Sequence, residues 1–107
     1  MIVQSEIESI LAEQFQPQWL EVLNESHMHS VPANSETHFR VVLVSELFTD
    51  KRSVARHQAV YRALQPQLDG PVHALALHTY TPQEWAQRQQ NAPESPDCLG
   101  GSKAEAH

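Results

Sequence analysis

Three of the seven histidines in this 107-residue chain stand in one short stretch, NESHMHSVPANSETHF, at positions 27, 29 and 38. A neutral imidazole binds zinc, iron or copper well when a second ring converges with it. The Ser, Pro, Ala and Asn residues between His29 and His38 predict an exposed loop rather than a helix or a strand. These histidines are therefore either incidental polar residues, or at least one of them binds a ligand.

His73 is a different kind of candidate, because it lies in the apolar run VHALALH, which predicts a β-strand over residues 72–78. A strand fixes the direction of its side chains, so a loop histidine facing His73 would supply two ligands, half of a tetrahedral metal site. Cys98 is the only cysteine, which excludes an intramolecular disulfide and a multi-thiolate site built from this chain alone. Further ligands would come from another molecule, with Cys98 as a remote internal candidate. An ordinary polar role for each histidine is the alternative.

A second candidate region is basic, because four of the seven Lys and Arg residues fall between positions 51 and 62. A helix is predicted over residues 53–65, and its periodicity of about 100° per residue gives it two faces. The packed face would carry Val54, Tyr61, Leu64 and Leu68, with His57 near them, and the solvent face Arg52, Arg56 and Arg62, preceded by Lys51. Guanidinium groups pair well with phosphate oxygens, so the solvent face is either a phosphate-binding stripe or an ordinary solvated surface. The net charge of −6 argues against indiscriminate coating of nucleic acid, but not against a local basic face.

The elements that must position these residues form an α+β pattern. We expect, in order, a helix over 5–15, strands over 18–24 and 38–45, the helix over 53–65, the strand over 72–78 and a helix from 81. Thr81, Pro82 and Glu84 form the sequence signature of a capping box, and Pro66 should end or kink the preceding helix. The small polar residues from position 91 predict a disordered tail, so we expect one domain over 1–90 and a flexible segment over 91–107.

Several function classes are disfavoured by the sequence. No stretch approaches the roughly 20 apolar residues of a membrane span, and the N-terminal MIVQSEIESI carries acids where a signal peptide needs a basic flank. We therefore expect a cytoplasmic protein without a membrane partner. No serine lies in a G-x-S-x-G motif, and the three glycines form no phosphate-cradling loop, so we do not expect an enzyme.

Three segments, SETHFRVVLVSELF, ARHQAVYRAL and GPVHALALHTYTPQEW, resemble the BolA family, and the likeness runs over about residues 2–90. The resemblance implies an α-β-β-α-α-β-α fold, in which helices pack on a mixed three-stranded sheet. This fold is similar to the second type of KH domain but lacks its G-x-x-G loop. On this pattern an extra short helix is expected around residues 50–55. Asp50 departs from the family, whose members usually carry Gly there, and Pro66 is a second departure.

The resemblance also implies two functions. BolA-like proteins pair with monothiol glutaredoxins around a [2Fe-2S] cluster, to which the partner brings a cysteine and a glutathione thiol. His73 and His29 match the BolA-side ligands, with His27 a weaker candidate than His29, and no cofactor is expected on the chain alone. Bacterial members also resemble transcriptional regulators of stress and morphology, which implies DNA contacts from Lys51, Arg52, Arg56 and Arg62. The chain is thus expected to be a DNA-binding regulator that also pairs with a glutaredoxin. The alternatives are an iron–sulfur adaptor without direct DNA binding and a stress factor without a ligand, and a homodimer is left open.

Overall fold

The computed structural model describes residues 2–26, 35–89 and 92, and its elements follow the expected α+β order. They are α1 (Ile2–Phe15), β1 (Trp19–Asn24), β2 (His38–Val44), the 3-10 helix η2 (Glu46–Phe48), α2 (Ser53–Ala63), α3 (Gln65–Asp69), β3 (Ala74–Tyr80) and α4 (Pro82–Gln87). None of the helices in this part of the chain is both long and apolar enough to cross a membrane.

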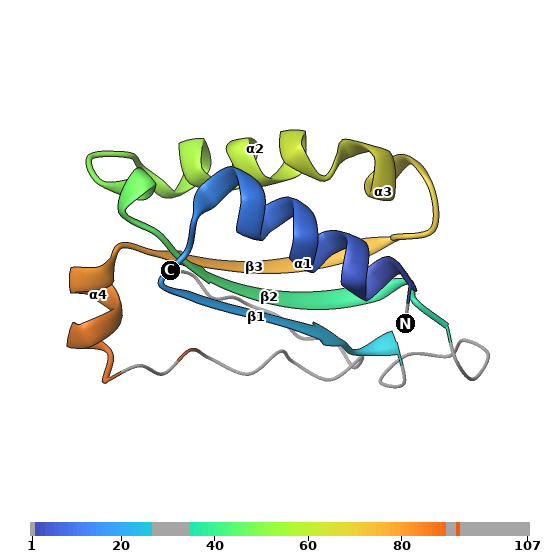
Figure 1. Ribbon diagram of the computed structural model, residues 1–107, viewed down its shortest axis with the longest axis horizontal. Coiled ribbons are helices and arrows are strands. Elements are labelled where there is room, and N and C mark those ends of the chain that lie inside the picture. The colour runs from blue at the N-terminus through green and yellow to red at the C-terminus, as the bar shows by residue number, and fades with distance from the viewer. Residues whose placement is uncertain (1, 27–34, 90–91, 93–107) are drawn as a thin grey trace.

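The three strands form one mixed sheet in the order β1-β2-β3, as expected. β1 and β2 are antiparallel, with Trp19 opposite Val44, whereas β2 and β3 are parallel, with His38 opposite Ala74. A parallel pair needs a crossover connection, which α2 and α3 supply (Figure 1). The first residues of β2 and β3 therefore lie side by side at one end of the sheet, and their last residues lie together at the other.

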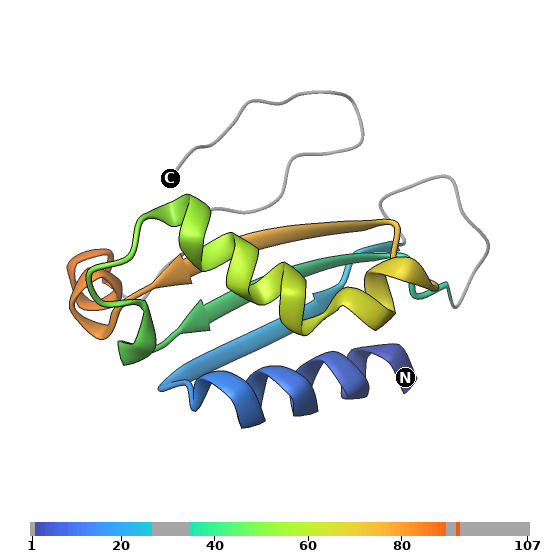
Figure 2. The ribbon, with the colours of Figure 1, turned by 90° about the horizontal axis from the view of Figure 1, so that it is seen from above.

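The main core lies between one face of the sheet and two helices. α1 and α2 both cover this face, and the two views agree on their placement (Figures 1 and 2). Alternate residues of β2 point into the core, because side chains of a strand alternate between its faces. The buried members of this core are Ile7, Leu11, Phe15, Val22, Phe39, Val41, Leu43, Phe48, Val60, Leu64, Val72 and Leu77.

The other face of the sheet carries a smaller apolar cluster. It consists of Val42, Val44, Tyr80 and Trp85, and Ala92 packs against it. α4 supplies Trp85, whose ring centroid lies 5.4 Å from that of Tyr80. β2 is thus buried on both faces, which explains its nearly continuous apolar run FRVVLV. Ala92 is the one described residue of the predicted tail, whose remaining positions lie outside the described residues.

The third strand begins two residues later than predicted, at Ala74 rather than at position 72, and ends at Tyr80. Val72 belongs to the preceding turn, because its N–H donates to the Gln67 carbonyl at 3.0 Å. His73 consequently precedes the strand instead of lying within it. Its backbone is nevertheless held by the sheet, since its N–H donates to the Thr37 carbonyl at 2.8 Å.

Pro66 ends α2 as predicted, and it explains where the extra short helix forms. Proline cannot continue a helix but suits the first turn of a new one. α2 therefore ends at Ala63, and α3 begins at Gln65 with Pro66 in its first turn. The extra helix expected around residues 50–55 is wrong in position, because the segment before α2 contains only the turn that follows η2.

Asp50 occupies a backbone conformation that favours glycine. Its φ is 66°, in the left-handed region, where a Cβ atom lies too close to the backbone. Asp50, which stands where related proteins usually carry glycine, therefore lies at the position of the turn after η2 that has a positive φ. Aspartate is among the non-glycine residues that tolerate this region best.

Replacing Asp50 with glycine should raise the free energy of unfolding by about 0.5–1 kcal/mol, because the relieved strain exceeds the extra entropy of the unfolded chain. The melting temperature should rise by a few degrees, about 4–8 °C per kcal/mol for a domain of this size. Asp50→Ala is the matched control, since it removes the carboxylate and keeps the Cβ atom. Equal stabilisation by both substitutions would show that charge, rather than backbone strain, limits this turn.

Candidate nucleic-acid interface and histidine pair

Arg56 is buried, and its predicted place on the solvent face of α2 is wrong. Only 7% of the residue is exposed. Its Nη1 and Nη2 donate to the two carboxylate oxygens of Glu84 at 2.7 and 3.1 Å, and Nη1 also donates to the Thr79 carbonyl at 3.3 Å. Nε donates to the Lys51 carbonyl at 2.8 Å, and the guanidinium lies 5.8 Å from the centre of the Phe48 ring. Arg56 is therefore committed to internal contacts rather than available to phosphate.

The two faces of α2 were assigned wrongly because the buried stripe contains an arginine. Arg56, Val60 and Leu64 recur at four-residue spacing and are all buried. By contrast, 67% of Val54 and 38% of Tyr61 are exposed, although both were expected on the packed face. From the apolar side chains alone, the predicted buried face of α2 was rotated about the helix axis relative to the observed one. Only the ion pair of Arg56 with Glu84 reveals which face is buried.

Glu84 joins the start of α2 to α4. Its Oε1 accepts from the Thr81 N–H at 3.0 Å, and its own N–H donates to Thr81 Oγ1 at 3.1 Å, which confirms the predicted capping box. The same carboxylate receives both donors of Arg56, a bidentate charge-assisted arrangement. The hydrogen bond from Arg56 lowers the pKa of Glu84 below its usual 4.5, and the Thr81 N–H and the charge of Arg56 lower it further, against partial burial, which raises it.

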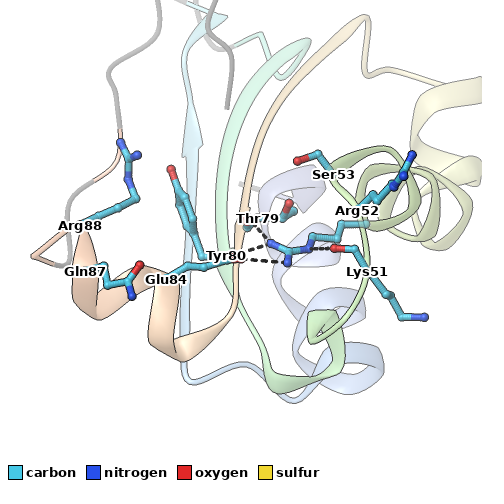
Figure 3. A pocket seen from close by; sticks show the side chains of 9 residues that line it. Lys51, Arg52, Ser53, Thr79, Tyr80, Glu84, Gln87 and Arg88 are labelled. Atoms are coloured by element: carbon cyan, nitrogen blue, oxygen red, sulfur yellow. Dashed lines mark hydrogen bonds and ion pairs between the residues drawn. The ribbon is translucent and has the colours of Figure 1, made fainter.

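A cleft of about 490 Å³ opens above this ion pair, between the start of α2 and α4. Lys51, Arg52 and Ser53 lie on the α2 side, and Gln87 and Arg88 lie on the α4 side (Figure 3). We call this the basic cleft, because its three exposed cations, Lys51, Arg52 and Arg88, border it from both sides. The exposed Asp50 beside Lys51 partly offsets their charge.

The start of α2 adds to the positive potential of the basic cleft. Arg52 is the N-cap of this helix, and its side chain makes no capping hydrogen bond. The first N–H groups of a helix have no partner within the helix and carry the positive end of its dipole. The positive end of the helix dipole therefore adds to the charge of the cations that line the cleft, an arrangement suited to an anionic oxygen ligand.

The structure brings together only some of the predicted phosphate ligands. Lys51 and Arg52 line the basic cleft, and Arg56 lies beneath them in its ion pair. Arg62 is in the last turn of α2, about 15 Å along the helix from Arg52. Arg88, which sequence reasoning missed, holds its guanidinium 5.1 Å from the centre of the Tyr80 ring. No sequence signal marked Arg88, because its place in the cleft depends on how α4 packs.

The opposite end of the sheet carries the histidine pair, His38 and His73. Their ring centroids lie 6.1 Å apart, and the ring planes meet at 74°. His73 is exposed and His38 is half-buried. The predicted loop ligand His29 and its neighbour His27 lie outside the described residues, so the pairing of His29 with His73 stays a prediction. Sequence reasoning missed that His38 approaches His73, because the parallel register of β2 and β3 creates this proximity. Within the described ranges, no group of three or more His, Cys, Asp or Glu residues could hold a metal ion.

Comparison with known proteins decides the family. The family model described as BolA-like protein matches residues 11–84. The chain belongs to the BolA family. A Vibrio cholerae protein named DNA-binding transcriptional regulator BolA is 53% identical over 98% of this chain and 99% of its own length, and an Escherichia coli protein of the same name is 50% identical over 94% and 95%. Mouse BolA1 in solution has a TM-score of 0.79 at 45% identity, covering 92% of this chain and 79% of that one.

BolA membership confirms the fold that the sequence resemblance implied. The BolA domain of SufE1 from Arabidopsis thaliana also matches, with a TM-score of 0.71 and 36% identity over 76% of this chain and 93% of that one. The α+β order, the mixed three-stranded sheet and the helices packed on it therefore all agree with the expected BolA architecture.

Replacing Arg56 with methionine should lower the free energy of unfolding at pH 7 by about 1–3 kcal/mol, the cost of removing a charged hydrogen-bond donor. The loss should be smaller than for a fully buried pair, because 44% of the Glu84 side chain remains exposed. Arg52→Met, at an exposed position nearby, should change stability by less than about 0.5 kcal/mol. Denaturant unfolding measures both, and equal stability of the two variants would contradict the structural role of Arg56.

The same comparison should depend on pH in a defined direction. Glu84 has a lowered pKa in the folded state, so its stabilisation is fully present well above the ordinary value of 4.5 and is lost as the pH falls through the folded-state pKa. The difference in free energy of unfolding between the parent chain and Arg56→Met should therefore be constant near neutrality and shrink on acidification below pH 4.5. A difference that grows on acidification would contradict this sign.

Proposed function

We propose that this protein is a cytoplasmic, non-enzymatic DNA-binding regulator whose basic cleft contacts backbone phosphates, and that it regulates genes of stress and morphology. The observation that carries the proposal is that Lys51, Arg52 and Arg88 all line one cleft beside the start of α2, whose N-cap side chain makes no capping hydrogen bond. The bacterial relatives that match almost the whole chain support it, since both are named DNA-binding transcriptional regulators. Arg56 supports the interface indirectly, because it fixes α4 and hence the position of Arg88.

The electrostatics predict a small, local footprint on DNA. A protein that neutralises phosphates releases their counterions. The logarithm of its binding constant therefore falls linearly with the logarithm of the salt concentration, with a slope of about −0.9 per phosphate contact. Three cations around one cleft correspond to a slope of roughly −3. The net charge of −6 repels DNA elsewhere on the surface, so binding requires that the cleft face the duplex.

We also propose that the chain pairs with a monothiol glutaredoxin around a [2Fe-2S] cluster, with His73 and the loop residue His29 as its ligands. Two observations on His73 support this role. The residue is exposed, so its imidazole can reach the iron of a cluster, and its backbone N–H donates to the Thr37 carbonyl, which fixes the position of the residue. The partner would supply its cysteine and a glutathione thiol. Imidazole in place of thiolate raises the reduction potential of such a cluster. A purely iron–sulfur adaptor without direct DNA binding is the alternative function.

Arg52→Gln and Arg88→Gln should each weaken binding to a mixed duplex pool several-fold and make the salt slope shallower by about 1. Arg62→Gln is the matched control, since Arg62 is exposed on the same helix but lies at its far end. Fluorescence anisotropy from 50 to 200 mM salt measures the slope. An equal loss in the Arg62 variant, or none in the other two, would contradict the basic cleft as the interface and favour the adaptor function.

His73→Ala should abolish the visible circular dichroism of the imidazole-ligated cluster in the anaerobically reconstituted glutaredoxin complex, and lower its iron content. His29→Ala should leave a weaker, more labile cluster, because a loop residue must first be ordered and His27 stands two positions away. His57→Ala, on α2, serves as the control and should retain the parent spectrum. An unchanged spectrum in the His73 variant would remove this histidine from the cluster.

A further inference from the structure

The second face of the sheet, opposite α1 and α2, extends beyond the smaller apolar cluster that α4 completes (Figures 1 and 2). Past this cluster, Leu23, Arg40 and Ala76 form one row across the three strands, because Leu23 is paired with Arg40 and Arg40 with Ala76. Arg40 stands two positions from Val42 of the cluster on β2, and alternate residues of a strand share a face. The row therefore lies on the second face.

Arg40 is buried on this face. Only 7% of the residue is exposed, against 39% of Leu23 beside it. An arginine on the outer face of a sheet is buried where another part of the chain lies over it, and Ala92 does so. Nη2 of Arg40 donates to the Ala92 carbonyl at 3.4 Å, across 52 positions of sequence, and Ala92 packs against the smaller apolar cluster. The chain that follows α4 therefore returns over the second face.

The turn after α4 directs this return. Gln89 has a φ of 58°, in the left-handed region, and its N–H donates to the Ala86 carbonyl at 3.0 Å. A left-handed residue directly after a helix is a common way to end the helix and change the direction of the chain. Pro93 then favours an extended backbone at Ala92, since the residue before a proline avoids the helical region. The chain is thus directed along the face beyond Ala92.

We propose that residues 93–99, PESPDCL, form a strap that docks on the row of Leu23, Arg40 and Ala76, with the Glu94 carboxylate paired with Arg40. The strap offers acidic and apolar side chains to a cation that lies between two apolar residues. At about 3.3 Å per extended residue, its seven residues span roughly 20 Å, and the outer strands of the sheet are only about 10 Å apart.

The strap changes the accessibility of the second face. Its two prolines restrict the free chain, so docking costs less conformational entropy than it does for a flexible segment. The docked strap makes the second face an internal surface, which a partner can use only after displacing it. The flexible tail expected from the sequence is then confined to residues 100–107. The strap uses neither the basic cleft nor a cluster ligand, so its failure leaves the proposed functions untouched.

Backbone ¹⁵N relaxation of the full-length chain tests the strap. The amides of residues 94, 95 and 97–99 should have heteronuclear NOE values close to those of β2, and the amides of residues 102–107 should have the low values of a mobile tail. Glu94→Gln should raise the ratio of undocked to docked strap by roughly tenfold, the typical effect of losing a charged hydrogen bond. Glu105→Gln is the matched control and should leave the strap as rigid as in the parent chain.

Three results would overturn the proposal. The first is a strap as mobile in the parent chain as residues 102–107, and the second is an equal release of the strap by Glu94→Gln and Glu105→Gln. The third is strap rigidity that rises with protein concentration, which would assign the second face to another copy of the chain. Arg40→Met should release the strap as Glu94→Gln does. If that variant fails to fold, the parent spectrum and the Glu94 variant still decide the matter.

Discussion

The parallel pairing of β2 with β3 is the constraint on which both candidate sites depend. It sets His38 opposite Ala74 at one end and Val44 opposite Tyr80 at the other. Two strands that start together also end together, so everything attached to their first residues gathers at one end of the sheet. The histidine pair lies at that end, and the turn into α4, with the basic cleft, follows the other. At about 3.3 Å per residue, the seven residues of each strand separate the two ends by roughly 20 Å.

At the cleft end, a single buried arginine connects three segments that are distant in sequence. Arg56 on α2 bonds to the carbonyl of Thr79 at the end of β3, to the carboxylate of Glu84 on α4 and to the carbonyl before α2. An arginine buried without such partners would be strongly destabilising, so the native packing of α4 and the burial of Arg56 require one another. The exposed cations Arg52 and Arg88 are held at their spacing by this contact without taking part in it. A residue first expected to bind phosphate thus instead positions those that line the cleft.

The features that the sequence predicted correctly are those with local causes. The capping box of Thr81 and Glu84, the end of α2 before Pro66 and the apolar run of β2 each depend on residues within a few positions of one another. Two of the errors arise from contacts between residues distant in sequence. Which face of α2 is buried depends on the bond between Arg56 and Glu84, which are 28 residues apart. The approach of His38 to His73 depends on strand register. The late start of β3 is a local effect that the apolar pattern did not reveal, because the Val72 N–H bonds to the preceding turn. Family resemblance supplied the overall fold, but neither the place of Arg88 nor the approach of His38 to His73.

The most direct test of the basic cleft as the nucleic-acid interface is a titration of the ¹⁵N-labelled chain with a short DNA duplex, followed through its backbone amides. The account predicts that the largest shifts occur at residues 51–55 and 87–88, where the N–H groups of the first turn of α2 and the segment of Arg88 meet the phosphate. Amides near Thr37, His38 and Ala74, at the other end of the sheet, should stay in place. Shifts centred on the histidine pair or on the last turn of α2 around Arg62, with residues 51–55 unmoved, would contradict it.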